Sequence, residues 1–224
     1  MEKLVKKIRI NTTLTLLTGL HIGGSSENVE IGGIDNAVIK LATKDNQPYI
    51  PGSSLKGKMR CLLEQIEGIS EIGGGRKLKF TEKSKACQEL INLFGFANDN
   101  KPSKILVRDA CLTDKSQKQL SECDSLDMPY TEGKWENVID RIKGTAEHPR
   151  QTERVPAGAE FDVEFVINVW DDDYDGKELL DMLKKGIRLI ENDYLGGSGS
   201  RGYGQVKFGE LQITELTNAN DWKA

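Results

Sequence analysis

Cysteine and histidine are scarce in this sequence of 224 residues, and they are not grouped. The four cysteines, Cys61, Cys87, Cys111 and Cys123, are widely spaced, form no CxxC pair and are accompanied by no paired histidines. This spacing argues against a zinc site and against a disulfide framework. Cys61 and Cys111 are expected to be core thiols instead.

Long hydrophobic runs are also absent. No apolar stretch approaches the roughly 20 residues that a membrane-spanning helix needs. The first residues, MEKLVKKIRI, enter an alternating pattern and contain no apolar segment of the signal-peptide type. We therefore expect a cytoplasmic globular protein with no membrane partner, built as one elaborated domain or two small ones.

The sequence has no excess of positive charge, because its formal net charge is −4. This value argues against a protein that coats nucleic acid indiscriminately. A basic groove on an otherwise acidic surface stays compatible with it, so the local distribution of charge must decide.

Hydrophobic periodicity predicts a core of six elements in the order strand, helix, strand, strand, helix, strand. The predicted ranges are 5–18, 53–66, 104–112, 161–169, 177–191 and 206–216. Ser53 or Ser54 is the expected N-cap of the first helix. Gly209 is expected to mark a bulge that returns Leu211 and Ile213 to the core face of the last strand. This order is that of an α+β, ferredoxin-like or RRM-like domain (βαββαβ).

Three insertions interrupt the predicted core. The first, 19–50, is rich in glycine and ends in a short hairpin, while the second, 68–103, contains a basic loop and a short helix near 86–94. The third, 113–159, has weak periodicity and is too long for a structureless connection in a compact domain. It is expected to have a function of its own.

A glycine loop, Leu195 to Gln205, lies between the second helix and the last strand, with five glycines among the nine residues 196–204. A tight turn is one explanation, and a cradle of backbone N–H groups for an anion is the other. Ser198, Ser200 and Arg201 favour the cradle because they add anion donors. The loop follows a helix and lacks a Gly-Lys-Ser/Thr ending, so a nucleotide cofactor is not expected.

The start of the first helix carries Lys56, Lys58 and Arg60 without an acidic residue. The helix dipole disfavours this arrangement, and Gly57 costs about 1 kcal/mol relative to alanine, so a bound anion is one explanation. A solvated charged face is the alternative. Lys56 and Arg60 share one edge of the helix and, together with the glycine loop, can form a groove for a polyphosphate backbone.

Residue pattern alone leaves the roles of His21 and Asp35 open. An aspartate in a glycine-rich loop is more often a turn former than a catalytic group. A lone histidine is more often packed or hydrogen bonded than a general base.

Several motifs in sequence order nevertheless resemble one family. They are LTGLHIGGS (17–25), IGGID (31–35), YIPGSSLKGKMRCLLE (49–64), ENVIDRI with PRQTERV (136–155) and DYLGGSGSRGYGQV (193–206). The chain resembles the backbone subunit of type III-A CRISPR interference complexes, in the Csm branch of the RAMP superfamily.

The resemblance implies a single RAMP domain over 1–224, with an RRM-like core near 1–20, 50–67, 104–112 and 160–216. Insertions of the lid type would span about 19–50 and 68–103. A thumb β-hairpin, about 124–159, would wedge into the guide–target duplex at regular six-nucleotide intervals and flip out a base. Copies of the chain would polymerise along one CRISPR guide RNA, together with other Csm subunits and the target RNA.

The resemblance also implies site residues. Asp35 would be catalytic and would bind a divalent metal, Mg²⁺ or Mn²⁺, while the neighbouring 2′-hydroxyl attacks to leave a cyclic phosphate. The family often has proline at the position of Ala37, and alanine in its place would loosen this loop. The residues implied to bind RNA are His21, Ser53, Ser54, Lys56, Arg60, Arg141, Arg150, Arg154, Gly197, Ser198 and Arg201.

Two alternatives follow from the same residues. In the first, the chain is a catalytically silent scaffold in which Asp35 only shapes a turn. In the second, it is a stand-alone nuclease that processes guide precursors, although the sequence shows no histidine-centred site for that reaction.

Overall fold

The computed structural model describes residues 3–24, 34, 36–68, 85–96 and 101–217. Asp35 and most of the basic loop lie outside the described residues. The elements are, in chain order, β1 (Leu4–Leu16), β2 (Lys40–Leu41), β3 (Gln47–Ile50), α1 (Gly52–Ile66), α2 (Lys85–Phe94), β4 (Ile105–Val107), β5 (Ala110–Leu112), α3 (Asp114–Ser121), β6 (Glu132–Ile139), β7 (Ala146–Arg154), β8 (Glu160–Trp170), α4 (Lys177–Glu191), a 3₁₀ turn (Gly199–Arg201), β9 (Val206–Phe208) and β10 (Gln212–Leu216).

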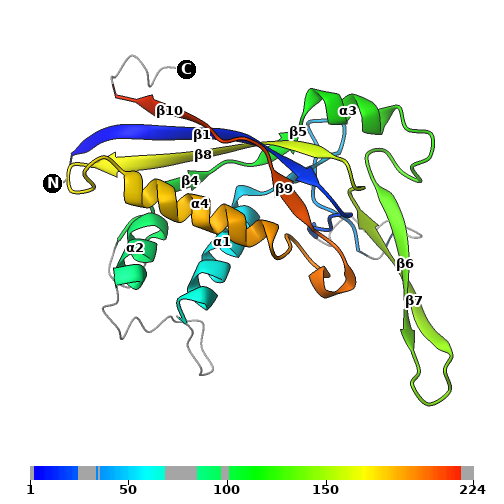
Figure 1. The fold of residues 1–224 in the computed structure, drawn as a ribbon. Coiled ribbons are helices and arrows are strands. Elements are labelled where there is room, and N and C mark those ends of the chain that lie inside the picture. The colour runs from blue at the N-terminus through cyan, green and yellow to red at the C-terminus, as the bar shows by residue number, and fades with distance from the viewer. Residues whose placement is uncertain (1–2, 25–33, 35, 69–84, 97–100, 218–224) are drawn as a thin grey trace.

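The main sheet is antiparallel and runs in the order β10-β1-β8-β5-β3-β2, with β9 also paired to β1 and β4 to β8. If β4 and β5 count as the second core strand and β9 and β10 as the fourth, the order is fourth, first, third, second. Helices α1, α2 and α4 lie on one face of this sheet (Figure 1). The predicted α+β core with βαββαβ order is therefore confirmed.

The core lies between the two central strands and these helices. Alternate residues of β1 and β8 point inward and are almost completely buried, among them Ile10, Leu14, Phe161 and Phe165. The helices approach each other closely, because a methyl group at Gly186 of α4 would overlap the Met59 side chain of α1. The α2 residues Leu90, Leu93 and Phe94 join the same core, so part of the segment predicted as a lid packs into the domain.

The predicted strand 104–112 is two strands, and the reason lies at the start of α1. Asp109, in the break between β4 and β5, accepts a hydrogen bond from the Gly52 N–H at 2.8 Å. A side chain at Gly52 would overlap the Val107 carbonyl. Pro51 is the N-cap and its own side chain makes no capping hydrogen bond, so the expectation of Ser53 or Ser54 at this position is wrong. The carboxylate of Asp109 instead supplies the negative charge that the helix dipole favours.

The last core strand contains the predicted bulge. Leu14 pairs with Phe208 and Asn11 with Gln212, so β9 and β10 use one residue more than β1, and the Gly209 N–H bonds to Thr13 O at 2.8 Å. Leu211 packs against the core, as expected. Ile213 is 42% exposed, against expectation, because it lies on the edge strand.

The expectation about the cysteines is also wrong. Cys61 is exposed on the outer side of α1, Cys111 is partly buried, and the buried thiol is Cys87 of α2. All four are free. No helix of the described chain is long and apolar enough to cross a membrane.

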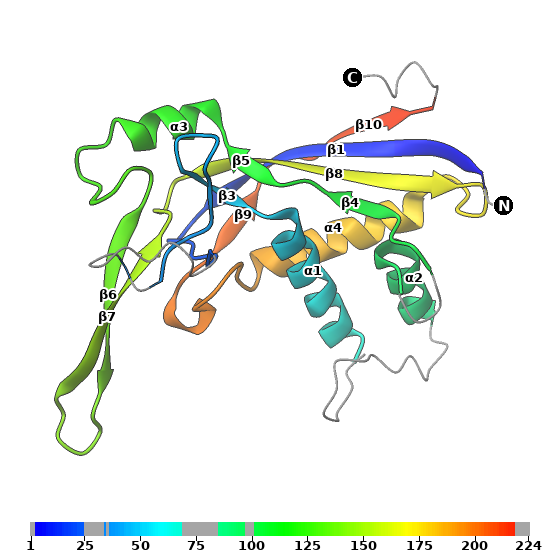
Figure 2. The same ribbon diagram turned by 180° about the vertical axis from the view of Figure 1, so that it is seen from behind.

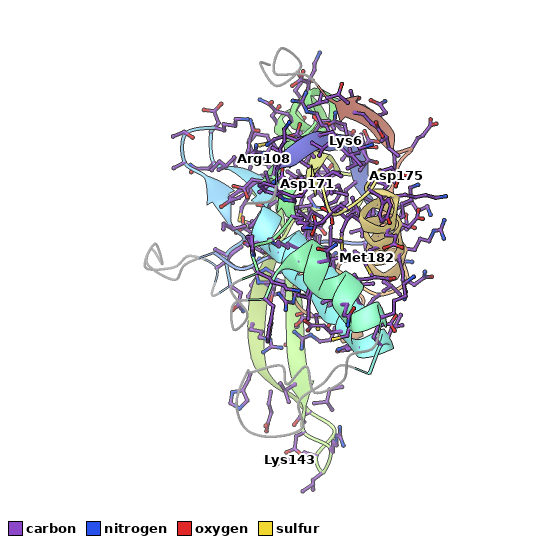
Figure 3. The ribbon with its side chains drawn as sticks, turned by 90° about the vertical axis from the view of Figure 1, so that its left-hand side faces the viewer. Lys6, Arg108, Lys143, Asp171, Asp175 and Met182 are labelled. Carbon is purple, nitrogen blue, oxygen red and sulfur yellow. The ribbon has the colours of Figure 1, made fainter. Side chains whose placement is uncertain are left out.

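The third insertion has two parts. Helix α3, which periodicity did not predict, is capped by Thr113, whose hydroxyl accepts from Ser116 N–H at 3.2 Å. Strands β6 and β7 then form a two-stranded hairpin that projects from the sheet (Figure 2). Its tip, marked by Lys143, lies at the opposite end of the molecule from Lys6 and Asp171 (Figure 3).

Candidate nucleic-acid interface

The glycine loop is closed at its base by backbone hydrogen bonds. Leu195 N–H donates to Gly204 O at 2.8 Å, and Gly204 N–H donates to Gly19 O at 3.0 Å. Gly197 N–H donates to His21 O at 2.8 Å, so one amide of the predicted cradle is already used. The loop is thereby fixed to the segment that follows β1.

Several glycines of the loop are explained by contact with its own chain. A methyl group at Gly199 would overlap the Tyr194 ring, and one at Gly204 would overlap the Leu195 carbonyl. One at Gly196 would overlap the His21 carbonyl. The glycine count alone therefore does not identify an anion cradle, and the anion donors to consider are the side chains of the loop.

Arg201 joins the glycine loop to the hairpin. Its guanidinium donates to the Ser198 hydroxyl and lies 3.2 Å from a carboxylate oxygen of Glu136 on β6. Half of the Arg201 side chain is exposed, so it can meet a ligand while it keeps these contacts. Ser198 and Arg201, both predicted site residues, are thus brought together.

Tyr203 forms the centre of this junction. Its ring is buried, with Lys134 Nζ 4.4 Å and the Arg154 guanidinium carbon 5.2 Å from its centroid, distances typical of cation–π contacts. Burial, followed by the nearby Glu136 carboxylate, raises the pKa of Tyr203. Arg154 also bonds to Glu132 at 2.6 Å. We call Lys134, Arg150, Arg154 and Arg201 the basic cluster.

Glu136 lies within the basic cluster, with a side chain only 9% exposed. Arg150 is 3.4 Å from its carboxylate. Burial alone would raise the pKa of Glu136, but other groups outweigh this effect and lower it below the ordinary value. These groups are the Tyr203 hydroxyl, Arg201, Lys134 and Arg150. The ionised carboxylate thus orders the cations without neutralising all of them.

The basic side chains at the start of α1 point in two directions. Lys56 donates to the Ser103 hydroxyl at 2.7 Å, and its pKa is lowered by burial and then by the nearby Arg60. Arg60 donates to Gly95 O at 3.3 Å and pairs with Glu64. Within the described ranges, neither side chain has a hydrogen bond or ion pair with the glycine loop.

Lys58 instead contacts the two residues that precede the glycine loop. Its Nζ is 2.7 Å from Asp193 and 3.7 Å from the centroid of the Tyr194 ring, directly before the loop. Gly57 has nothing within 4 Å of an added methyl group, so packing within the chain does not explain it. Together with exposed Ser53, it leaves the helix surface open to the close approach of a ligand.

The segment after Asp35 is fixed to the root of the hairpin. Asn36 forms a parallel bridge with Thr152 of β7, and its carbonyl accepts from the Glu153 N–H at 3.0 Å. On the other side, Ile39 N–H donates to Ile22 O at 2.8 Å. His21, one residue before Ile22, bonds through Nδ1 to Glu153 O at 2.7 Å.

Glu153 is the principal contact of this segment. It is 2% exposed, and its carboxylate accepts from Val38 N–H at 2.9 Å and from the Thr131 hydroxyl at 2.6 Å. Lys40 Nζ is 2.5 Å away. The charge is buried but fully partnered, which keeps Val38 and Lys40 at the hairpin root.

Comparison with known proteins assigns this arrangement to a family. The sequence matches the RAMP superfamily over residues 13–207. A Methanocaldococcus jannaschii protein described as "CRISPR system Cms endoribonuclease Csm3" is 42% identical over 213 residues, 92% of this chain and 80% of that protein. A Streptococcus thermophilus protein of the same description is 41% identical over 222 residues, 97% and 94% of the two chains. The chain belongs to the Csm3 family of the RAMP superfamily.

Solved structures agree with the family assignment. A chain of the Csm3–Csm4 subcomplex of a type III-A CRISPR-Cas interference complex is 26% identical, with a TM-score of 0.58 and coverage of 99% of this chain and 86% of that one. A chain of the type III-B Cmr-beta complex bound to cognate target RNA has a TM-score of 0.61 at 18% identity, with coverage of 93% and 61%. The second similarity concerns the fold alone.

For this Csm3-family chain, the predicted site residues separate into three places. His21, Gly197, Ser198, Arg201, Arg150 and Arg154 surround the hairpin root, Arg141 lies near the hairpin tip, and Ser53, Ser54, Lys56 and Arg60 lie on α1. Sequence reasoning assigned no site role to Lys58, Glu136, Glu153 or Tyr203. Their charges and aromatic ring were visible, but their partners lie far away in sequence.

No group of three or more potential metal ligands occurs within the residues that the structure describes. Glu153 is the buried carboxylate that contacts the residues following Asp35. It is already bonded to Lys40, Val38 and Thr131. Among the described residues, Glu153 is therefore not an open ligand for a metal at this place.

Proposed function

We propose that the chain binds the guide RNA of a type III-A CRISPR complex and cleaves the bound target RNA with Asp35. The observation that carries this proposal is the hairpin root. One side of it contacts the glycine loop through the basic cluster, and its β7 edge pairs with the segment that follows Asp35. Guide binding and cleavage would thus share one rigid support.

The guide would be bound mainly through its phosphates. Arg201 and Arg150 are about half exposed within the basic cluster, and guanidinium groups match phosphate geometry. Binding of this kind does not depend on base sequence, as a guide of variable sequence requires. On α1, Ser53, Ser54 and Gly57 would border the guide RNA. Lys56 and Arg60 would give up their contacts with Ser103 and Gly95 and bind RNA instead.

Cleavage would follow from geometry imposed on the target strand. The 2′-oxygen attacks the adjacent phosphorus, the bond from phosphorus to the 5′-oxygen breaks, and the products are a 2′,3′-cyclic phosphate and a 5′-hydroxyl. Flipping a base with the hairpin, the proposed thumb, would let the 2′-oxygen reach the in-line position. Asp35 would accept the 2′-hydroxyl proton, and the departing 5′-oxygen would take a proton from solvent water.

A divalent cation, Mg²⁺ or Mn²⁺, is part of the proposal. When bound, it would supply charge stabilisation at the scissile phosphate. A single carboxylate suits Mg²⁺, because this ion keeps several of its waters and is often bound by one or two carboxylates together with phosphate oxygens of the substrate. Further copies of this chain, other Csm subunits and the target RNA would be the macromolecular partners.

The assembled complex with a matched target RNA tests the proposal. Asp35→Ala should abolish the periodic cuts while target binding persists, because the change removes a carboxylate without touching the basic cluster. Asp181→Ala, on the exposed side of α4, is the matched control and should cut normally. Persistent cuts in Asp35→Ala would leave an RNA-binding scaffold whose cleaving group lies elsewhere.

A further inference from the structure

Strand β10 forms an edge of the main sheet within the described chain. It pairs with β1 on one side and stands at the end of the strand order. Its residues, 212–216, pair with β1 in unbroken register and include no proline. Alternate residues of an edge strand turn their N–H and C=O groups away from the sheet, where a further strand can bond them. Nothing within β10 itself prevents such an addition.

A groove of about 380 Å³ lies beside this edge, between α4 and the bulge that joins β9 to β10. Its floor is apolar and consists of Ile187, Phe208 and Leu211. Ile213 of β10 pairs with the core residue Ile10, so it lies on the face of the sheet that α4 covers. Because Ile213 is 42% exposed, it extends the apolar floor to the open edge.

The polar rim of the groove is positively charged. Lys184, Arg188 and Glu191 lie along one stripe of α4, and Lys207 faces them from β9. Arg188 is exposed, and its guanidinium has no hydrogen bond or ion pair in the part of the chain that the structure describes. Glu191 is already engaged, because it accepts from the Phe208 N–H at 2.8 Å and lies 3.1 Å from Lys207 Nζ. Three cations and one engaged carboxylate favour an anionic occupant.

An extended protein segment matches these features better than RNA does. A strand can satisfy the open backbone groups of β10, and a nucleic acid has no repeating amides to do so. Phe208 is the aromatic residue of the groove and is only 6% exposed, so bases have no ring on which to stack. A second copy of this chain is also a poor source, because its acidic run at 171–175 lies in turns and a bend instead of a strand.

We propose that β10 and this groove bind an extended acidic segment of a partner protein, distinct from further copies of this chain. The segment would add to the sheet beside β10 through backbone hydrogen bonds, while its side chains provide the specificity. Its carboxylates would pair with Arg188, Lys184 and Lys207, and an apolar side chain between them would contact Ile213. The inference goes beyond the proposed function and does not depend on cleavage by Asp35.

The test uses the guide-loaded complex and a fluorescein-labelled peptide, Glu-Thr-Glu-Thr-Ile-Thr-Glu. In an extended strand, the glutamates and the isoleucine of this peptide share one face. Fluorescence anisotropy should show saturable binding. Arg188→Glu should weaken this binding at least about 10-fold, because like charges then face each other. Lys177→Glu, at the other end of the same helix, is the matched control and should bind normally.

Peptides that are N-methylated on alternate amides separate strand addition from simple charge attraction. Methylation of the amides that face β10 should abolish binding, and methylation of the other set should leave it unchanged. Equal binding of the two methylated peptides, or an equal loss in Lys177→Glu, would overturn the inference. Displacement of the peptide by an oligouridine would overturn it in favour of an RNA site. Failure of the guide-loaded complex to bind would also overturn it, and binding confined to the isolated chain would assign this edge to contacts between subunits of the complex.

Discussion

At the scale of single residues, Glu153 shows how a buried charge can organise two functional segments. Its carboxylate bonds the residues after Asp35, while its backbone carbonyl bonds His21. Burying an ion is costly unless its hydrogen-bonding capacity is satisfied, and here three groups satisfy it. The residue is best regarded as a structural contact of the proposed cleavage loop.

Glu153→Ala should lower the free energy of unfolding by about 1–3 kcal/mol, because it leaves Val38 N–H, Thr131 and Lys40 without their partner. Urea denaturation monitored by circular dichroism measures the change. Glu215→Ala, which removes an exposed ion pair with Lys6, should shift the same quantity by less than about 0.5 kcal/mol. Equal effects of the two variants would contradict the assigned role of Glu153.

The roles of single residues were harder to predict from the sequence than the fold. The basic run at the start of α1 was visible, but a helix turns by about 100° per residue. Lys58 therefore meets Tyr194, while Lys56 meets Ser103. Which of them faces the glycine loop depends on how α1 packs against α4, a tertiary fact that no local pattern contains.

At the scale of elements, α1 combines a packed side with an open side. Gly186 of α4 is required by the packed side, because Met59 occupies the space of a side chain there. Gly57 lies on the open side, where an added methyl group meets nothing. The two glycines look alike in sequence but have different causes.

Gly57→Ala should stabilise the protein without RNA by about 1 kcal/mol, because alanine is the better helix former. The same change should weaken guide binding, because the methyl group enters the surface proposed to border the RNA backbone. Denaturation and filter binding measure the two effects. Gly186→Ala should instead destabilise the protein, and a Gly57→Ala chain that binds guide normally would remove α1 from the interface.

Elements with strong periodicity were predictable, and irregular ones were not. The alternation in β1 and β8 and the apolar stripe of α4 identified the core, because burial on one face leaves its period in the sequence. Helix α3 is short and mostly polar, so it has no comparable pattern. The break between β4 and β5 serves the start of α1, which is a long-range cause.

At the scale of the whole molecule, a chain with net charge −4 carries its proposed RNA-binding cations on the hairpin, the glycine loop and α1. Arg201→Ala and Arg150→Ala should each lower the slope of log K against log salt for guide binding by roughly 0.7–0.9, the value for one phosphate contact. Titrations at several salt concentrations with two unrelated guide sequences measure this slope. Lys177→Ala, at the far end of α4, should leave it unchanged. A loss confined to one guide sequence would contradict recognition through phosphates.

The bridge between Asn36 and Thr152 gives the molecule a mechanical property. In effect it adds a third strand to the root of a two-stranded hairpin whose tip extends far from the sheet (Figure 1). Such a hairpin is a lever with a long arm outside and a short arm beside the backbone next to Asp35. We expect force on the tip to be transmitted to that backbone.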